Sequence, residues 1–135
     1  MRIVLDTNVL ISGTFWNGLS MRILGLIESG NHELIISSDI VEEYRRVIMY
    51  KELADKIRHF EERKLAINKI INLGIMVHPK NKLKVVLDDP DDDKFVEAAV
   101  AGNAKCIISQ DKHILKLLRY NDIKIQTPQQ FLEEN

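Results

Sequence analysis

The stretch Arg2-Ile3-Val4-Leu5-Asp6-Thr7-Asn8 decides the fold of this chain. A short apolar run of this kind predicts a buried strand over residues 2–5. The run stops at a carboxylate, Asp6, and open α/β sheets place their ligand sites at the carboxyl ends of central strands. We therefore expect Asp6 to be the first residue of a ligand site.

Length and composition set limits on the rest of the chain. The 135 residues fit one domain over 1–135, and 45% hydrophobic with 29% charged residues is ordinary for a globular protein. The net charge of −1 gives no overall attraction for a polyanion, so nucleic-acid binding would need a local patch or bound metal. Apolar runs are too short for a membrane span, and Asp6 interrupts a possible signal peptide. The lone Cys106 reads as a core residue and fits a reducing cytoplasm.

Strand-like and helix-like segments alternate along the chain. Strands are expected at 2–5, 33–37, 75–78, 105–109 and 123–125. Helices are expected from Ser20 to Gly30, after Ser38 or Asp39, over 50–73, from Pro90 to Gly102, after Asp111 and after Pro128. This alternation predicts a three-layer α/β/α domain with a central parallel sheet of four to five strands and right-handed crossovers.

The stretch 12–18 between the first strand and the first helix is expected to be irregular. It holds Phe15 and Trp16, which either pack against the core or stack on a base.

Glu43 stands out within its predicted helix. Its neighbours on the apolar stripe are Ile40, Val41, Tyr44, Val47 and Ile48. Glu43 lies at the edge of this stripe, and a glutamate there is either paired or ligated, or it reaches solvent along its methylenes. Spacing alone leaves both interpretations open.

The densest acidic run is Asp88-Asp89-Pro90-Asp91-Asp92-Asp93. Counting back at helical spacing from the apolar stripe of the following helix places Asp92 on the side that faces the sheet, whereas Asp93 is expected to point away. Asp111 follows the fourth predicted strand, where its structural role would be the N-cap of the next helix.

These acids converge at one sheet edge if the strands at 2–5 and 105–109 are neighbours. Clustered carboxylates repel, and their pKa values rise unless a cation lies among them. Oxygen ligands without Cys or His select Mg²⁺ or Mn²⁺, ions that bind phosphates and activate water. The pattern therefore predicts phosphodiester hydrolysis. Three residues stand where they could hydrogen-bond the ligands: Thr7, Asn8 and Ser109.

Other acidic motifs fit worse. An EF-hand loop starting at Asp88 or Asp91 lacks Gly at its sixth position and Glu at its twelfth. No Gly-rich loop follows the first strand, so a Rossmann or P-loop nucleotide site is excluded. A phosphoaspartate enzyme would usually have a second Asp where Asn8 stands.

Four segments, at 4–10, 37–47, 89–95 and 107–112, together resemble the PIN-domain family of metal-dependent ribonucleases. The resemblance covers nearly the whole chain and selects Asp92 among the neighbouring acids. It implies a parallel sheet flanked by helices and a helical clip around 50–73. It also implies an acidic pocket that holds Mg²⁺ or Mn²⁺, made of Asp6, Glu43, Asp92 and Asp111.

The same resemblance implies cleavage of single-stranded RNA by a metal-activated water. Many members are VapC-like toxins of toxin–antitoxin pairs and many are dimers, which implies a homodimer and a small antitoxin protein as partner. We expect Lys112 and Lys84 to touch the RNA backbone. Two residues depart from the family pattern, because Gln110 stands where Gly is frequent and His113 where a further acid is common.

Two rival functions remain open at this level. One is a non-catalytic RNA-binding or scaffold domain of the same fold. The other is a phosphohydrolase of small phosphate esters that forms a phosphoenzyme at Asp6.

Overall fold

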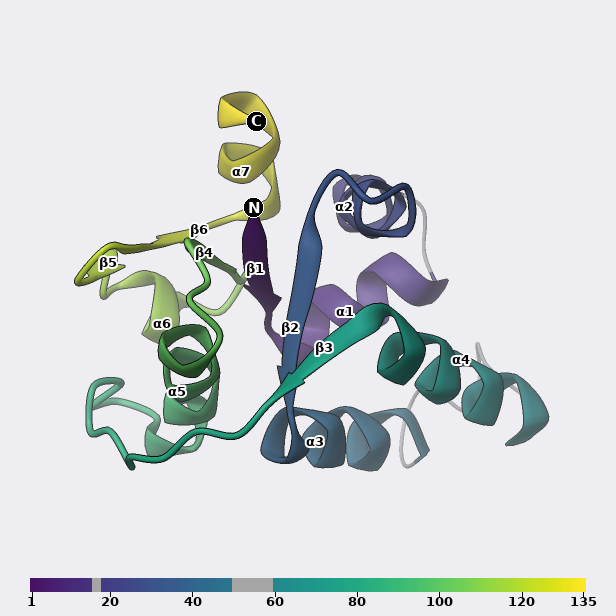
Figure 1. Ribbon diagram of the computed structural model, residues 1–135, viewed down its shortest axis with the longest axis horizontal. Coiled ribbons are helices and arrows are strands. Elements are labelled where there is room, and N and C mark those ends of the chain that lie inside the picture. Colours follow the sequence, from purple (N-terminus) through teal and green to yellow (C-terminus); the bar gives the residue numbers. More distant parts are fainter. Residues whose placement is uncertain (16–17, 50–59) are drawn as a thin grey trace.

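The computed structural model describes residues 1–15, 18–49 and 60–135, and Figure 1 shows a twisted sheet with helices on both sides. The described strands are β1 (Arg2–Leu5), β2 (Glu33–Ser37), β3 (Gly74–Val77), β4 (Cys106–Ile108), β5 (Arg119–Tyr120) and β6 (Ile123–Gln126). They form one sheet in the order β3-β2-β1-β4-β6-β5. Every neighbouring pair is parallel except β5 with β6, which is antiparallel. The predicted α/β fold is confirmed, and the additional strand β5 is too short to leave a periodic pattern in the sequence.

The described helices are α1 (Thr7–Phe15), α2 (Leu19–Glu28), α3 (Ser38–Met49), α4 (Phe60–Leu73), α5 (Asp93–Ala101), α6 (Lys112–Leu115) and α7 (Pro128–Glu134), with a 3-10 turn η2 (Pro90–Asp92) before α5. Figure 1 shows α5 and α6 on one side of the sheet and α1, α2 and α4 on the other. Right-handed crossovers account for this division, because the chain moves outward from β1 in one direction to reach β3 and in the other to reach β6. None of the described helices is long and apolar enough to cross a membrane.

The core is built on the central strands. In β1, Ile3, Val4 and Leu5 are at most 1% exposed, since helices cover both faces of the sheet. Burial of each such side chain contributes about 1.5–3 kcal/mol. On the α5 face, Gly102 ends the helix against β2, where a Cβ atom would lie 2.6 Å from Cγ2 of Ile35. This close approach holds α5, and the acids that precede it, tightly on the sheet.

The segment after β1 differs from the prediction. Residues 7–15 form α1, whereas the sequence predicts an irregular stretch over 12–18. The backbone carbonyl of Asp6 accepts the Leu10 N–H at 3.0 Å, and its side chain accepts the Val9 N–H at 2.9 Å. The acid therefore starts the helix itself, which outweighs the weak helix propensity of the β-branched residues that follow. α2 begins at Leu19, so Ser20 is a buried residue within it and not its cap.

Two sequence-based expectations concern residues that the structure does not describe. Trp16 and positions 50–59 of the expected helical pair lie outside the described ranges, and only its second part, α4, is seen. Phe15 is partly buried against the core, which is the packing alternative for this residue.

Candidate metal centre

The carboxyl ends of β1 and β4 lie side by side. Leu5 pairs with Ile108 in the parallel register, and the Asp6 N–H donates to the Ile108 carbonyl at 3.0 Å. The residues that follow the two strands therefore share one edge of the sheet. This meets the condition on which the predicted convergence of acids depends.

Asp6 is the most enclosed of these acids, at 5% exposure. Its Oδ1 accepts the Val9 N–H, while its Oδ2 accepts the Ser109 hydroxyl and, at 3.4 Å, the Gln110 N–H. Burial raises the pKa of Asp6, the three hydrogen bonds oppose this, and the charge of Asp111 adds to the increase. The carboxylate is thus held in one orientation at the base of the site.

Asp111 and Ser109 are coupled in the loop after β4. The Ser109 hydroxyl, while donating to Asp6, accepts the Asp111 N–H at 2.9 Å. The Asp111 side chain accepts the His113 N–H at 2.8 Å and so caps α6, as its structural role predicts. One carboxylate oxygen remains for another partner, and Ser109 supports both acids, consistent with its predicted supporting position.

Asp92 lies close to Asp89 and Asp111, each half-buried. One carboxylate oxygen from each of the three lies within 4.8 Å of the other two. Burial, followed by the negative charges of Asp89 and Asp111 and then those of Glu43 and Asp6, raises the pKa of Asp92 to about 7. These three residues, called the acidic triad below, are an all-oxygen donor set of the kind that binds Mg²⁺ or Mn²⁺.

The prediction that Asp93 points away is wrong. Asp93 is 7% exposed, and its Oδ1 accepts the N–H groups of Val85 and Val86 at 3.0 and 2.8 Å. Glu97, one turn later, accepts the Leu83 N–H at 2.8 Å. The error arises because α5 begins only at Asp93, after a 3-10 turn, so helical phase cannot be extended backwards through the acids.

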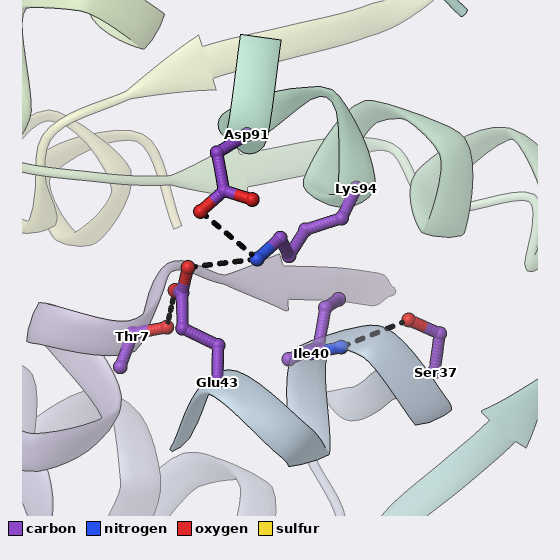
Figure 2. Close-up of polar contacts among 6 residues, drawn as sticks. All are labelled: Thr7, Ser37, Ile40, Glu43, Asp91 and Lys94. Atoms are coloured by element: carbon purple, nitrogen blue, oxygen red, sulfur yellow. Dashed lines mark hydrogen bonds and ion pairs between the residues drawn. The ribbon is translucent and has the colours of Figure 1, made fainter. Parts of the chain in front are cut away.

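Glu43 projects from α3 toward the N-terminal end of α5, as Figure 2 shows. Its Oε1 contacts the Lys94 ammonium at 2.8 Å, and its Oε2 accepts the Thr7 hydroxyl. Of the two alternatives for this glutamate, the structure shows a paired side chain. The Ile40 N–H donates to the Ser37 hydroxyl at 3.3 Å, so α3 is capped by Ser37 and not by Ser38 or Asp39.

The other predicted site residues are solvent-exposed. Asn8 lies on the outer face of α1, Lys112 begins α6 beside Asp111, and Lys84 lies in the connector before η2. None of them contacts the acidic triad through a described hydrogen bond or ion pair.

Asp89 and Lys94 are the site residues that sequence analysis missed. A signal for Asp89 exists, because Asp-Pro opens a turn and residues three apart in a 3-10 turn lie on one side. The Asp92 N–H donates to the Asp89 carbonyl at 3.0 Å, as that turn requires. No local signal exists for Lys94, since its partner Glu43 is 51 positions away.

A sequence model of the PIN domain matches residues 2–113. The chain belongs to the PIN domain family. The family resemblance drawn from the four motifs is thereby confirmed. The search of curated proteins found no match for this PIN domain.

Solved structures share the fold at low sequence identity. VapBC2 from Rickettsia felis, bound to a DNA fragment from their promoter, matches with a TM-score of 0.65 and 16% identity over 94% of this chain and 98% of that chain. VapBC-1 from nontypeable Haemophilus influenzae matches with 0.59 and 16% over 96% and 99%. FitAcB from Neisseria gonorrhoeae matches with 0.57 and 14% over 94% and 98%. These likenesses establish the PIN fold over nearly the full length.

Proposed function

We propose that this PIN domain is a metal-dependent endoribonuclease that hydrolyses phosphodiester bonds of single-stranded RNA. The observation that carries the proposal is the acidic triad beside Asp6 at the carboxyl edge of the sheet. Three carboxylates this close repel one another unless a cation lies among them, and burial together with the charges of Asp89 and Asp111 raises the pKa of Asp92. Family membership supports the nuclease class.

Mg²⁺ or Mn²⁺ is the cofactor that this donor set fits. Asp92 and Asp111 would hold the ion together with Asp6 and Asp89. Glu43 would line the site beside them, in contact with Lys94 and Thr7. A divalent ion bound there supplies positive charge to the scissile phosphate and acidifies a water molecule. Ser109 orients Asp6 and Asp111 through its two hydrogen bonds, so the ligands are positioned before any ion arrives.

RNA would approach from the exposed side of this edge. Lys112 adjoins Asp111 and Lys84 precedes the acidic run in the sequence, and we propose that both contact phosphates on either side of the scissile bond. With a net charge of −1, the protein depends on such local cations and on bound metal to hold RNA.

We further propose that the protein is the toxin of a toxin–antitoxin pair, acting in the cytoplasm as a homodimer with a small antitoxin partner. The motif resemblance to VapC-like toxins and the similar folds in the two VapBC structures support this. Expression of the chain is expected to arrest growth, whereas Asp92→Asn is expected to permit it. Light scattering on the purified protein reports the dimer.

The nuclease proposal is tested with a labelled single-stranded RNA and Mn²⁺. Wild-type protein is expected to cut it, EDTA to stop cutting, and Asp92→Asn and Asp111→Asn to lower the rate at least a hundredfold. Asp122→Asn is the matched control, because Asp122 is an exposed acid in the turn between β5 and β6. Cleavage that survives EDTA, or that is equal in all variants, would refute the proposal. Binding without cleavage would instead favour a non-catalytic RNA-binding domain.

A further inference from the structure

Lys94 is a partly buried cation inside an acidic site. Its side chain is 11% exposed, whereas the other lysines in described ion pairs, Lys69, Lys116 and Lys124, are 51–72% exposed. Its ammonium lies 2.8 Å from Glu43 and 3.3 Å from Asp91, between the two carboxylates (Figure 2). Removing an ammonium from water is costly unless opposite charges surround it. Glu43 and Asp91 supply those charges to Lys94.

The carboxylates of the site fall into two groups. Both oxygens of Glu43 have partners, Lys94 on one and Thr7 on the other. Within the described part of the chain, no ion pair joins a basic side chain to any member of the acidic triad. Lys94 therefore neutralises the group made of Glu43 and Asp91, whereas the acidic triad has no such cation among the described ion pairs.

We infer that the Lys94 ammonium takes the place of a second metal ion, so that the site binds one divalent ion, at the acidic triad, and reserves Glu43 as the partner of Lys94. Like charges repel strongly in a partly desolvated site, and a divalent ion on Glu43 or Asp91 would lie next to the ammonium. Both elements that carry this pair, α3 and α5, are packed helices, so the ammonium is held in position. Lys94 is thus a positioning residue, which sets the number of ions. The inference rests on the proposed metal centre and adds its stoichiometry.

The test counts Mn²⁺ ions bound per chain, which needs no RNA and no turnover. Electron paramagnetic resonance of free Mn²⁺ during titration gives the count. Wild-type protein is expected to bind one ion. Lys94→Met, which keeps the length of the side chain and removes its charge, is expected to bind two.

Three further variants separate charge from structure. Lys94→Arg restores a cation and is expected to bind one ion. Lys94→Met combined with Glu43→Gln is expected to return from two ions to one, because the second ion would use Glu43. Lys69→Met is the matched control and is expected to bind one ion, since Lys69 pairs with Glu28, also at 2.8 Å, away from the site.

The outcomes are distinguishable. Two ions in the wild-type protein, one ion in Lys94→Met, or two in Lys94→Arg would overturn the inference and leave the proposed nuclease standing. No bound ion in the wild-type protein would overturn the metal centre and the inference with it. If Lys94→Met does not fold, as judged by circular dichroism, Lys94→Gln replaces it and the wild-type count still decides.

Discussion

Substitution of Asp93 tests how the acidic run is held in place. The Asp93 carboxylate accepts two backbone N–H groups, from Val85 and from Val86, in a site that is 7% exposed. The Val86 carbonyl in turn accepts the Asp89 N–H at 3.2 Å. Asp93 is thus connected through the backbone to a member of the acidic triad, without being a ligand itself.

The cost of Asp93→Ala follows from these bonds. A hydrogen bond to a charged group contributes about 1.5–3 kcal/mol, and a buried N–H left without an acceptor costs about 1–3 kcal/mol. Because both bonds share one oxygen, they are not additive, and we expect a total loss of about 3 kcal/mol. Asp93→Asn keeps an acceptor oxygen in the same place and is expected to lose about 1 kcal/mol.

Urea unfolding at pH 7 in the presence of EDTA measures both losses. Amide hydrogen exchange should also quicken at Val85 and Val86 in Asp93→Ala, because their acceptor is gone. A loss below about 0.5 kcal/mol for Asp93→Ala would refute the argument, since surface substitutions that break nothing fall in that range. Equal losses for the two variants would show that the charge of Asp93, and not its acceptor geometry, holds the segment.

Three further predictions follow from single residues. The pKa of Asp92 is raised from 3.8 to about 7, so the metal-free fold retains a proton that the unfolded chain has lost. The free energy of unfolding should therefore fall as pH rises from 3.8 to about 7. Urea unfolding at several pH values tests this, and an equally steep fall for Asp92→Asn would contradict it. Burial, with the charge of Glu134, raises the pKa of the Cys106 thiol to about 12, so a disulfide reagent should react with it at pH 8 only in denaturant. Gly102→Ala should cost about 1–3 kcal/mol in thermal unfolding through its contact with Ile35. The control Gly25→Ala, in the interior of α2 with open space around it, should instead gain about 0.5–1 kcal/mol.

Much of the fold could be predicted because its signals are local. The runs at 2–5, 33–37 and 123–125 are apolar where β1, β2 and β6 are buried, and the Thr127-Pro128 start of α7 carries a complete capping box. Prediction failed at 12–15, in a helix whose start depends on hydrogen bonds to Asp6, and at β5, which exists only as a partner of β6. In both cases the decisive contact is made by a neighbour that propensity does not include.

The candidate site divides in the same way. Asp6 and Asp111 could be selected because each follows a strand end, where topology brings parallel strands to one edge, whereas Asp92 was selected among its neighbours by the family resemblance. Asp89 could have been found from the Asp-Pro turn signal, but the side to which Asp93 points could not be read from the run of acids. The adjacent residues Asp92 and Asp93 differ in the direction of their carboxylates. The 3-10 turn directs Asp92 toward Asp111, whereas Asp93 faces the connector at 83–86.

The amino-acid order was sufficient to give the class of fold, the strand ends at which acids stand and the family to which the chain belongs. Those properties depend on periodicity and on motifs a few residues long. Which carboxylates share a cation was decided only in three dimensions, because the partners are distant in the chain. Lys94 meets Glu43 from 51 positions away, and Ser109 meets Asp6 from 103, so charge pairing at this site is a property of the packed sheet edge.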